Sequence, residues 1–522
     1  MKKNKNRLLL FLKNNDNKIL IIGSIIFELI IYILTPYLEY NAKTIISLLF
    51  LCILSIFLIL NNKKTYKKNI FYLIFILGLL LRTIYILYTS AHIRQHDVLA
   101  LNEEGHLGYI YTLFKTYRLP TTNTWQFYHP PAWHILGAIW LKINELLKMD
   151  LLVSIEGIQI ITTLLSSFII LIVDKINIKL NIKNKYRYLI DLMFAIHPAL
   201  IILSGSINND CLLIFLEFLT ILLLINWHNL PDIKNTIYLA ITTGLCVMTK
   251  ANGALIAVPI LYIFINKFIY YLKNNKKQIK QFISKIITFG IISLPIGLWF
   301  QIRSLVLFSK TEIPSPGDWL YTGNHSIISR FININLKELF HYANMDKDYN
   351  IPSFIIKSSL FGEYSFNNLS NIIKYTLLIT NIILIIISTI FIIKYIFNKK
   401  KNIYINTLII TWISTLISMI IFNYKYPYAC SMDFRYIEIC LLTGIIMLNY
   451  SNDNTKLRRV INIIQYIFIS TSILFIFMIW YKLKTRTIYS SSIFLLEDPV
   501  GFEPTIRELQ SHALPLGYRS IA

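Results

Sequence analysis

The sequence predicts an all-α membrane protein that crosses the bilayer many times. Hydrophobic residues make up 55% of the 522 residues and charged residues only 15%, whereas a soluble globular chain carries roughly a quarter charged residues. The mean hydropathy is +0.56. The apolar residues gather in blocks of ~20, about the length of a helix that crosses the hydrocarbon core. The alternating pattern of a membrane β-barrel is absent.

About thirteen apolar blocks are each predicted to form a membrane-spanning helix. They cover residues 18–36, 44–61, 70–90, 151–173, 188–206, 210–227, 236–249, 253–270, 285–302, 373–393, 403–423, 433–450 and 460–480. No small-residue cleavage site follows the first block, so we expect this block to remain as a helix and not to be removed as a signal peptide.

The positions of the basic residues predict how the chain is oriented. The formal net charge is +24, but no basic face with interleaved aromatic residues is present, so nucleic-acid binding is not expected. The basic residues instead form short runs between apolar blocks, within residues 63–68, 175–187, 273–280, 399–401 and 456–459. Short basic loops of membrane proteins lie in the cytoplasm. A cytoplasmic N-terminus puts every one of these runs on that side, which indicates a multi-pass protein of the plasma membrane in this orientation.

The blocks and loops divide the chain into six segments. These are the N-terminal transmembrane helices 1–90, an external loop 91–150, transmembrane helices 151–302, a second external loop 303–372, the C-terminal transmembrane helices 373–480 and a tail 481–522. In the first loop, stretches 105–118 and 132–147 are too polar or too short to span, so we expect helices that lie along the membrane surface. Residues 501–520 resemble the peptide that results when a reading frame runs through a transfer-RNA gene, and the tail is assigned no function.

The first external loop contains the side chains that indicate chemistry. They are His96, Asp97, Glu103, Glu104, His106, Tyr109, Tyr128 and His129. A carboxylate at the outer surface lies where a membrane-bound substrate and a second substrate meet. It can act as general base to a hydroxyl within hydrogen-bond reach. The alternative is a solvated interfacial loop whose charges face water.

The loop resembles the first external loop of the GT-C glycosyltransferases. The pattern within residues 96–142 is HD, EEGHLGYI, LP and FYHPPAWHILGAIWLK, and it is most similar to the protein mannosyltransferase and aminoarabinose transferase relatives of glycosyltransferase family 39. Later stretches agree in order and in predicted side, namely SGSINND (204–210), TKAN (249–252), WFQIRS (299–304) and DFRY (433–436). One departure concerns the acidic pair that many family members have soon after the first helix. Here the loop follows the third block and its pair is His96-Asp97.

The resemblance implies a GT-C-like fold and transfer of a sugar from a polyprenyl-phosphate carrier to an acceptor hydroxyl on the outer face, with inversion. By this resemblance, residues 91–150 form the catalytic loop and Asp97 is the general base, with Glu103 or Glu104 as substitutes. His106 and Tyr109 would orient the base or bind the sugar. Tyr128, His129 and His96 are further candidates for substrate binding. Lys250, Arg303 and Arg435 are candidate contacts to the phosphate, on which charge develops as it leaves. No cofactor is expected, because the lipid-phosphate sugar is a substrate.

Simpler explanations exist for several of these residues. Arg303 and Arg435 are also positioned where long basic side chains anchor a helix at the membrane surface. Lys250 can be an ordinary lysine of a turn. Asn208 to Asp210 can cap the following helix. Tyr128 to Pro131 also suits a turn before a surface helix. His92, His96, His129 and His134 make a metal site conceivable, but no carboxylate–histidine pattern of known geometry accompanies them, so no metal is expected.

Two other functions fit part of the sequence. A transporter or flippase of lipid-linked sugars often places ionisable residues at mid-membrane, and Glu28, Glu156 and Glu217 are candidates for that position. A sugar polymerase or ligase uses the same lipid donors but has different motifs. The acceptor is expected to be a protein, a lipid or a polysaccharide.

Overall fold

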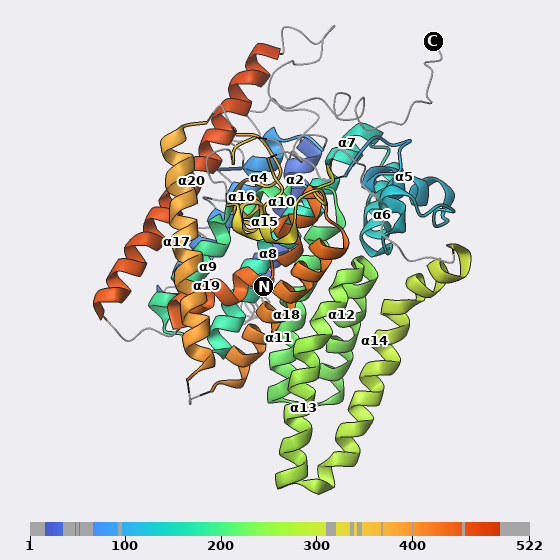
Figure 1. The fold of residues 1–522 in the computed structure, drawn as a ribbon. Helices are drawn as coiled ribbons and strands as arrows, with labels where there is room; N and C mark the ends of the chain where they lie inside the picture. Colours follow the sequence, from blue (N-terminus) through green and yellow to red (C-terminus); the bar gives the residue numbers. More distant parts are fainter. Residues whose placement is uncertain are drawn as a thin grey trace, which may run out of the picture.

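The regular structure of the chain is helical. The computed structural model describes residues 16–34, 47–48, 52, 66–91, 97–308, 320–334, 339–341, 347–366, 369–398, 401–450 and 455–490. Within these ranges no β-strand forms, and a single isolated bridge pairs Tyr321 with Tyr428. Figure 1 shows the helices packed against one another in a bundle. The prediction of an all-α polytopic membrane protein is confirmed.

The helices follow the predicted blocks closely. The first half of the described chain contains α2 (Asp16–Leu34), α4 (Tyr66–Tyr88), α5 (His106–Thr116), η2 (Trp125–Tyr128), α6 (Ala132–Leu146), α7 (Leu151–Glu156), α8 (Ile158–Lys179), α9 (Asn184–Ile196), α10 (Pro198–Ser204), α11 (Asn209–Asn229) and α12 (Ile233–Thr249). The second half contains η3 (Ala251–Ile256), α13 (Ala257–Asn274), η4 (Lys276–Gln278), α14 (Ile279–Phe308), α15 (Ile327–Ile332), α16 (Ile351–Phe361), α17 (Asn371–Ile396), α18 (Ile403–Lys425), η6 (Ala429–Met432), η7 (Phe434–Ile437), α19 (Cys440–Tyr450) and α20 (Thr455–Ser490).

Eight helices among the described residues are long and apolar enough to cross a membrane, or nine if the bent pair α9–α10 is one span. The expected count of about thirteen is therefore not confirmed. Block 44–61 lies almost wholly outside the described residues, α12 has 17 residues, and the blocks at 18–36 and 433–450 contain shorter apolar helices. The last of these is short because residues 434–437 form the 3₁₀ turn η7 before α19 begins.

Block 188–206 is broken in its middle by a proline. Pro198 starts α10, and the two helices bend by 44°, because proline has no N–H to donate and its ring clashes with the preceding turn. The buried Arg82 of α4 compensates for the lost hydrogen bonds. Its guanidinium donates to the carbonyl oxygens of Ala195 at 2.8 Å and Phe194 at 3.2 Å, and to Oγ of Ser166 at 2.8 Å. A backbone break inside the bilayer is tolerated because protein groups satisfy it in this way.

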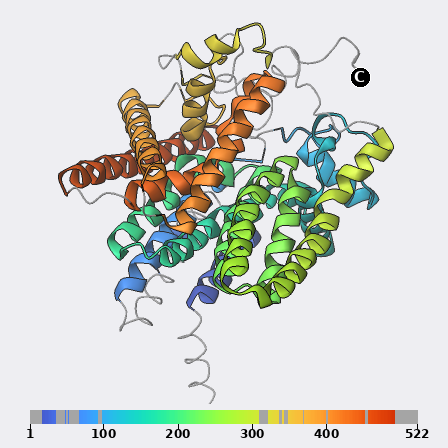
Figure 2. The same ribbon diagram turned by 60° about the horizontal axis from the view of Figure 1, so that its bottom comes forward.

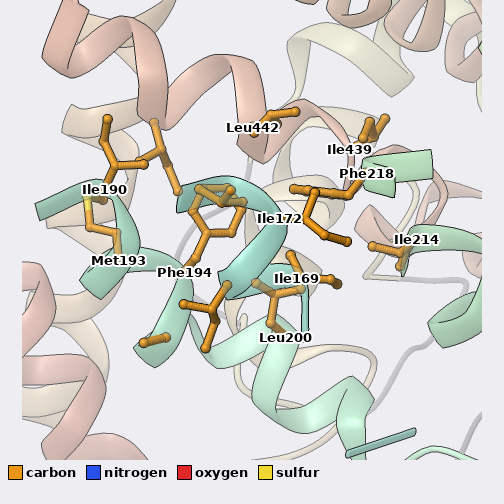
Figure 3. Close-up of a cluster of buried hydrophobic side chains, with 14 of the residues drawn as sticks. Ile169, Ile172, Ile190, Met193, Phe194, Leu200, Ile214, Phe218, Ile439 and Leu442 are labelled. Carbon is orange, nitrogen blue, oxygen red and sulfur yellow. The ribbon is translucent and has the colours of Figure 1, made fainter. Parts of the chain in front are cut away.

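The centre of the bundle is an apolar cluster formed by α8, α9, α10, α11 and α19. Figure 3 shows Phe194 in this cluster together with Ile169, Ile172 and Leu200, and with Phe218 and Leu442 on neighbouring helices. The rings of Phe194 and Phe218 meet edge to face, with centroids 5.7 Å apart. Lipid is as apolar as these side chains, so close packing rather than removal of apolar surface from water holds the helices together.

Helix α14 lies at the edge of the bundle and packs mainly on α12. Small residues bring the two helices together: a Cβ on Gly244 would lie 2.8 Å from Cβ of Ile296, and one on Gly297 would lie 3.1 Å from Cβ of Val247. Large exposed side chains on α14 recur as Ile287, Ile291, Leu294 and Leu298. This spacing is that of one helix face, which we interpret as the face toward lipid.

The loops predicted on opposite sides of the membrane lie at opposite ends of the molecule. Figure 1 places α5 and α6 in its upper part and the turn between α13 and α14 at the bottom. In Figure 2 the green helices around α12 to α14 keep to one flank, and the orange-red α17 and α20 lie on the other. The surface stretches 105–118 and 132–147 form α5 and α6. In the second loop α16 is more deeply buried than an external loop suggests, since Phe354, Lys357 and Phe361 are at most 1% exposed.

Candidate active site

A cavity of about 240 Å³ lies where the ends of several helices meet. Its wall combines the loop that contains Asp97, the start of α11, the turn from α12 into η3, the ends of α14 and α18, and the turns η6 and η7. The predicted site residues that line it are Asp97, His106, Tyr128, His129, Lys250 and Arg435. These positions span more than 300 residues of sequence, yet the predicted topology puts all of them on the same side of the membrane.

Two carboxylates and two cations form the charged part of the cavity. Oδ1 of Asp210 lies 2.5 Å from Nζ of Lys250, and Oδ2 of Asp210 lies 3.6 Å from Nε of Arg435. Oδ2 of Asp97 lies 3.7 Å from Nη2 of Arg435. Arg435 therefore lies between the two carboxylates. The ring of Tyr436 packs under both cations, 4.6 Å from Nζ of Lys250 and 5.2 Å from the guanidinium carbon of Arg435.

Asp210 and Asp97 differ in how exposed their carboxylates are, and this difference suits them to different roles. The side chain of Asp210 is 2% exposed and that of Asp97 is 46% exposed. Burial lowers the pKa of Lys250, and the neighbouring Asp210 opposes this by raising it. Asp210 is thus occupied by two cations and keeps them in place, whereas Asp97 can accept a proton from a hydroxyl that enters the cavity.

The three buried charged residues, Asp210, Lys250 and Arg435, are each positioned by the end of a helix. Asn208 caps α11 by accepting a hydrogen bond from the backbone N–H of Asp210 at 3.1 Å, and the positive N-terminus of a helix favours an anion there. Lys250 ends α12, where the negative end of a helix favours a cation. Asp433 accepts from the backbone N–H of Arg435 at 2.8 Å and so starts η7.

Asp97 is positioned by a tight loop that leads into α5. Its φ is +57°, and its carbonyl oxygen accepts from the backbone N–H of His106 at 2.9 Å. Two glycines make the loop possible. A Cβ on Gly105 would lie 2.3 Å from the carbonyl oxygen of Val98, and one on Gly108 would lie 1.7 Å from that of Glu103. A left-handed residue at a cavity is a common property of functional sites, because the surrounding structure must hold it against strain.

Three histidines form a buried group beside the charged residues. Nδ1 of His106 lies 3.0 Å from Nε2 of His134, and the rings of His106 and His129 stack with centroids 5.5 Å apart. Tyr109 stacks on His134 at 3.9 Å. Burial lowers the pKa of all three imidazoles, that of His134 to about 3. They are therefore neutral hydrogen-bonding groups at pH 7 and not additional positive charges.

Four other predicted residues lie outside the cavity wall. Glu103 accepts from the backbone N–H of Ala100 at 2.9 Å and shapes its own loop. Glu104 accepts from the hydroxyls of Thr122 and Thr124. Tyr109 is fully buried, and Arg303 donates from Nη2 to the carbonyl oxygen of Pro120 at 2.8 Å. His96 lies outside the described residues. Their proposed roles in substrate binding or catalysis stay predictions.

Several residues of the wall were not singled out as site residues by the sequence analysis. Asp210 was considered only as part of a helix cap, although its position at the predicted outer end of a span was a signal. The aromatic residues Trp125, Tyr426 and Tyr428 also line the cavity, and nothing distinguished them from other aromatic residues of a membrane protein. Within the part of the chain that the structure describes, no group of three His, Cys, Asp or Glu side chains is arranged to hold a metal ion.

Comparison with protein families gives a match over part of the chain. Residues 152–308 match the family described as dolichyl-phosphate-mannose-protein mannosyltransferase. This match supports a glycosyltransferase of the GT-C superfamily. The GT-C match includes Asp210, Lys250 and Arg303, whereas Asp97 and Arg435 lie on either side of it. No curated protein sequence matches the chain.

Three solved structures give weak similarities over most of the chain. ArnT from Cupriavidus metallidurans in the apo state is 10% identical, with a TM-score of 0.43 over 73% of this chain and 60% of that one. The oligosaccharyltransferase of Archaeoglobus fulgidus, tethered to an acceptor peptide with the NVT sequon, is 13% identical, with a TM-score of 0.45 over 79% and 55%. The same organism's AglB with an inhibitory peptide and a dolichol-phosphate is 12% identical, with a TM-score of 0.45 over 79% and 56%. The chain thus spans 60% or less of the length of these three proteins.

Proposed function

We propose that the protein is a membrane glycosyltransferase that moves a sugar from a polyprenyl-phosphate donor to an acceptor hydroxyl. The observation that carries this proposal is the cavity in which a half-exposed carboxylate, Asp97, lies beside two buried cations, Lys250 and Arg435. A base for the incoming hydroxyl and positive charge for a leaving phosphate are the two groups that such a transfer needs. The family match adds a lipid-phosphate sugar as the donor class.

The reaction uses the charges as follows. Asp97 takes the proton of the acceptor hydroxyl as the oxygen attacks the anomeric carbon of the donor sugar. The bond from that carbon to the phosphate oxygen breaks on the opposite face, so the anomeric configuration inverts. The polyprenyl phosphate leaves with the electron pair of that bond. Lys250 and Arg435 stabilise the charge that develops on its oxygens.

Binding of the donor also changes the surroundings of the base. In the cavity Arg435 is 3.7 Å from Asp97 and 3.6 Å from Asp210, distances longer than a direct hydrogen bond. Its buried Nε makes no hydrogen bond. A phosphate oxygen of the donor supplies a hydrogen-bond acceptor for Nε of Arg435. As the guanidinium of Arg435 moves toward the phosphate, Asp97 becomes free to accept the proton of the acceptor hydroxyl.

The membrane arrangement belongs to the same proposal. The cavity opens to the outer side of the plasma membrane, the N-terminus is cytoplasmic, and the lipid tail of the donor remains in the bilayer beside the helix ends. The orientation rests on the basic runs of the sequence. The reaction as written uses no cofactor and no metal ion. The acceptor is a protein, a lipid or a polysaccharide.

A transfer assay with Asp97 variants tests the proposal. Membranes that contain the protein are supplied with a radiolabelled polyprenyl-phosphate sugar, and labelled product and released lipid phosphate are measured. Asp97→Asn should lower the rate by about 100- to 10,000-fold, the range expected for loss of a general base, while the protein stays inserted. Glu145→Gln is the matched control, because Glu145 is an exposed carboxylate of α6 that forms a surface ion pair with Lys142. It should leave the rate unchanged.

The same assay separates the enzyme from a carrier. Bond cleavage that depends on Asp97 supports the glycosyltransferase. Translocation of the intact lipid-linked sugar without cleavage would reject it in favour of a flippase. Transfer at the full rate by Asp97→Asn would reject Asp97 as the base.

A further inference from the structure

Trp125 is held at the cavity in an unfavourable state. Its φ is +45°, a conformation that bulky side chains rarely adopt, and its side chain is 44% exposed although it lines the cavity. Both the strained backbone and the exposed indole cost free energy of folding. These costs are explained if the exposed indole at the cavity wall has a role toward a ligand.

Glu104 holds the segment that presents Trp125. Its carboxylate accepts hydrogen bonds from the hydroxyls of Thr122, at 3.0 Å, and of Thr124. Its backbone carbonyl oxygen accepts from the N–H of Gln126 at 2.9 Å. One residue of the loop before α5 therefore fixes the chain immediately on both sides of Trp125.

The surroundings of Trp125 suit a sugar ring. The aromatic residues Tyr128, Tyr426 and Tyr428 line the same cavity, together with the amides of Asn123 and Gln126. A pyranose has apolar C–H faces and a polar edge of hydroxyls. Aromatic rings that carry a polar handle, with amides beside them, match both parts of such a ligand.

One stretch of backbone at this wall is not free to pair with an extended peptide. Peptides often bind by adding a strand to a free backbone edge. Here the backbone at residues 427–428 is already paired with the chain itself. The N–H of Thr322 donates to the carbonyl oxygen of Pro427 at 2.7 Å, and Tyr321 forms an isolated antiparallel bridge with Tyr428.

We propose that Trp125 stacks on the sugar ring of a carbohydrate acceptor, and that Glu104 is the positioning residue that aims it. The acceptor hydroxyl is thus carried by a glycan and not by a protein side chain. This inference rests on the proposed glycosyl transfer and names its acceptor class. It also gives Glu104 a different role from that of a substitute base.

Acceptor kinetics test the inference. The probes are methyl glycosides of neutral hexoses, short oligosaccharides, and a hexapeptide that contains Ser and Thr, each with the radiolabelled lipid donor. Trp125→Ala should raise KM for a glycan acceptor by about ten-fold, the effect of losing one aromatic stacking contact, with KM for the donor unchanged. Trp125→Phe should restore most of the affinity. Glu104→Gln should raise the same KM without the loss of rate expected of a missing base.

The control is Trp299→Ala. Trp299 is exposed to a similar extent, 37%, but it lies on α14 outside the cavity wall and donates to the sulfur of Met248. Its loss should leave the acceptor KM unchanged. The inference would be overturned if the enzyme used the peptide as acceptor and Trp125→Ala left the KM for that peptide unaltered. It would also be overturned if Trp125→Ala and Trp299→Ala changed the acceptor KM equally.

A binding measurement keeps the inference separate from the proposed reaction. Tryptophan fluorescence of purified protein is titrated with the oligosaccharides, without donor, and compared with that of Trp125→Phe. A saturable change that the variant loses supports a glycan site even where no transfer is detected, in which case the reaction itself is wrong. Absence of that change, or the same change with the peptide, overturns the glycan site even where transfer occurs.

Discussion

At the scale of single residues, the neutral histidine group predicts how stability depends on pH. Burial lowers the pKa of His134 to about 3, below the ordinary value of about 6.5 that applies to the unfolded chain. Below pH 6.5 the unfolded chain therefore binds a proton that the folded chain does not, and stability falls as the pH falls. His134 alone should lower the free energy of unfolding by about 2 kcal/mol between pH 7 and pH 5.

Thermal unfolding in detergent micelles at the two pH values measures this effect. His134→Gln removes the titrating group, so the difference between pH 7 and pH 5 should shrink in the variant. His106 and His129 titrate in the same sense, because burial also lowers the pKa of each, so part of the pH dependence should remain. An equal pH dependence in the variant and the unaltered protein would contradict the assignment.

Single residues also show what the sequence can and cannot predict about the site. Asp97, Lys250 and Arg435 were predicted from the resemblance to the GT-C glycosyltransferases together with their predicted position on the outer side, and they meet in the cavity. The partner that connects the two cations, Asp210, follows from the tertiary structure. Glu104 belongs to the same acidic pair as Glu103, and only the fold shows that its carboxylate turns to Thr122 and Thr124 rather than to the cavity.

At the scale of elements, the loop before α5 depends on the absence of side chains at two positions. A Cβ on Gly108 would lie 1.7 Å from the carbonyl oxygen of Glu103, so Gly108→Ala must displace backbone that leads to Asp97. Displacement of a catalytic group by about 1 Å costs on the order of 100-fold in rate. We expect a loss of transfer of at least about that size, measured with the lipid donor, in a protein that is still inserted.

Gly290 of α14 provides the contrast for this prediction. A Cβ there meets only Cδ1 of Leu294, at 3.9 Å, and alanine in a helix interior is more stable than glycine by roughly 0.5–1 kcal/mol. Gly290→Ala should therefore leave transfer unchanged. Full activity of Gly108→Ala would show that the loop before α5 does not position the base.

Elements also differ in how well periodicity predicts them. Long apolar blocks such as 373–393 and 403–423 became α17 and α18 with small shifts of their ends, because nothing inside them competes with a helix. Block 188–206 was predicted as one span, although it contains Pro198. The break is stable because Arg82, from a distant helix, donates to the exposed carbonyl groups, and a partner of that kind is not visible in a local pattern.

At the scale of the whole molecule, the topology predicted from charge and the cavity support each other. The chain segments that form the cavity wall are all predicted to lie on the outer side, and the basic turn at residues 273–280 lies at the other end of the bundle (Figure 1). Apolar length and basic runs are properties of local sequence, so they predict sides well. The number of spans is less predictable, because length alone does not distinguish a short buried helix such as α19 from a spanning one.

Cysteine labelling tests the sides and their orientation together. Two native cysteines would interfere, because Cys52 is exposed and Cys430 lines the cavity, so both are first replaced by serine. Single cysteines are then introduced at Glu145 of α6, which is 46% exposed, and at Lys277 of the exposed turn η4. A membrane-impermeant maleimide should label Glu145→Cys in intact cells and Lys277→Cys only after permeabilisation, because basic turns stay in the cytoplasm. The reverse labelling pattern would place the cavity on the cytoplasmic side and rule out a reaction on the outer face. Labelling of both cysteines in intact cells would contradict the separation of the two ends of the bundle by a bilayer.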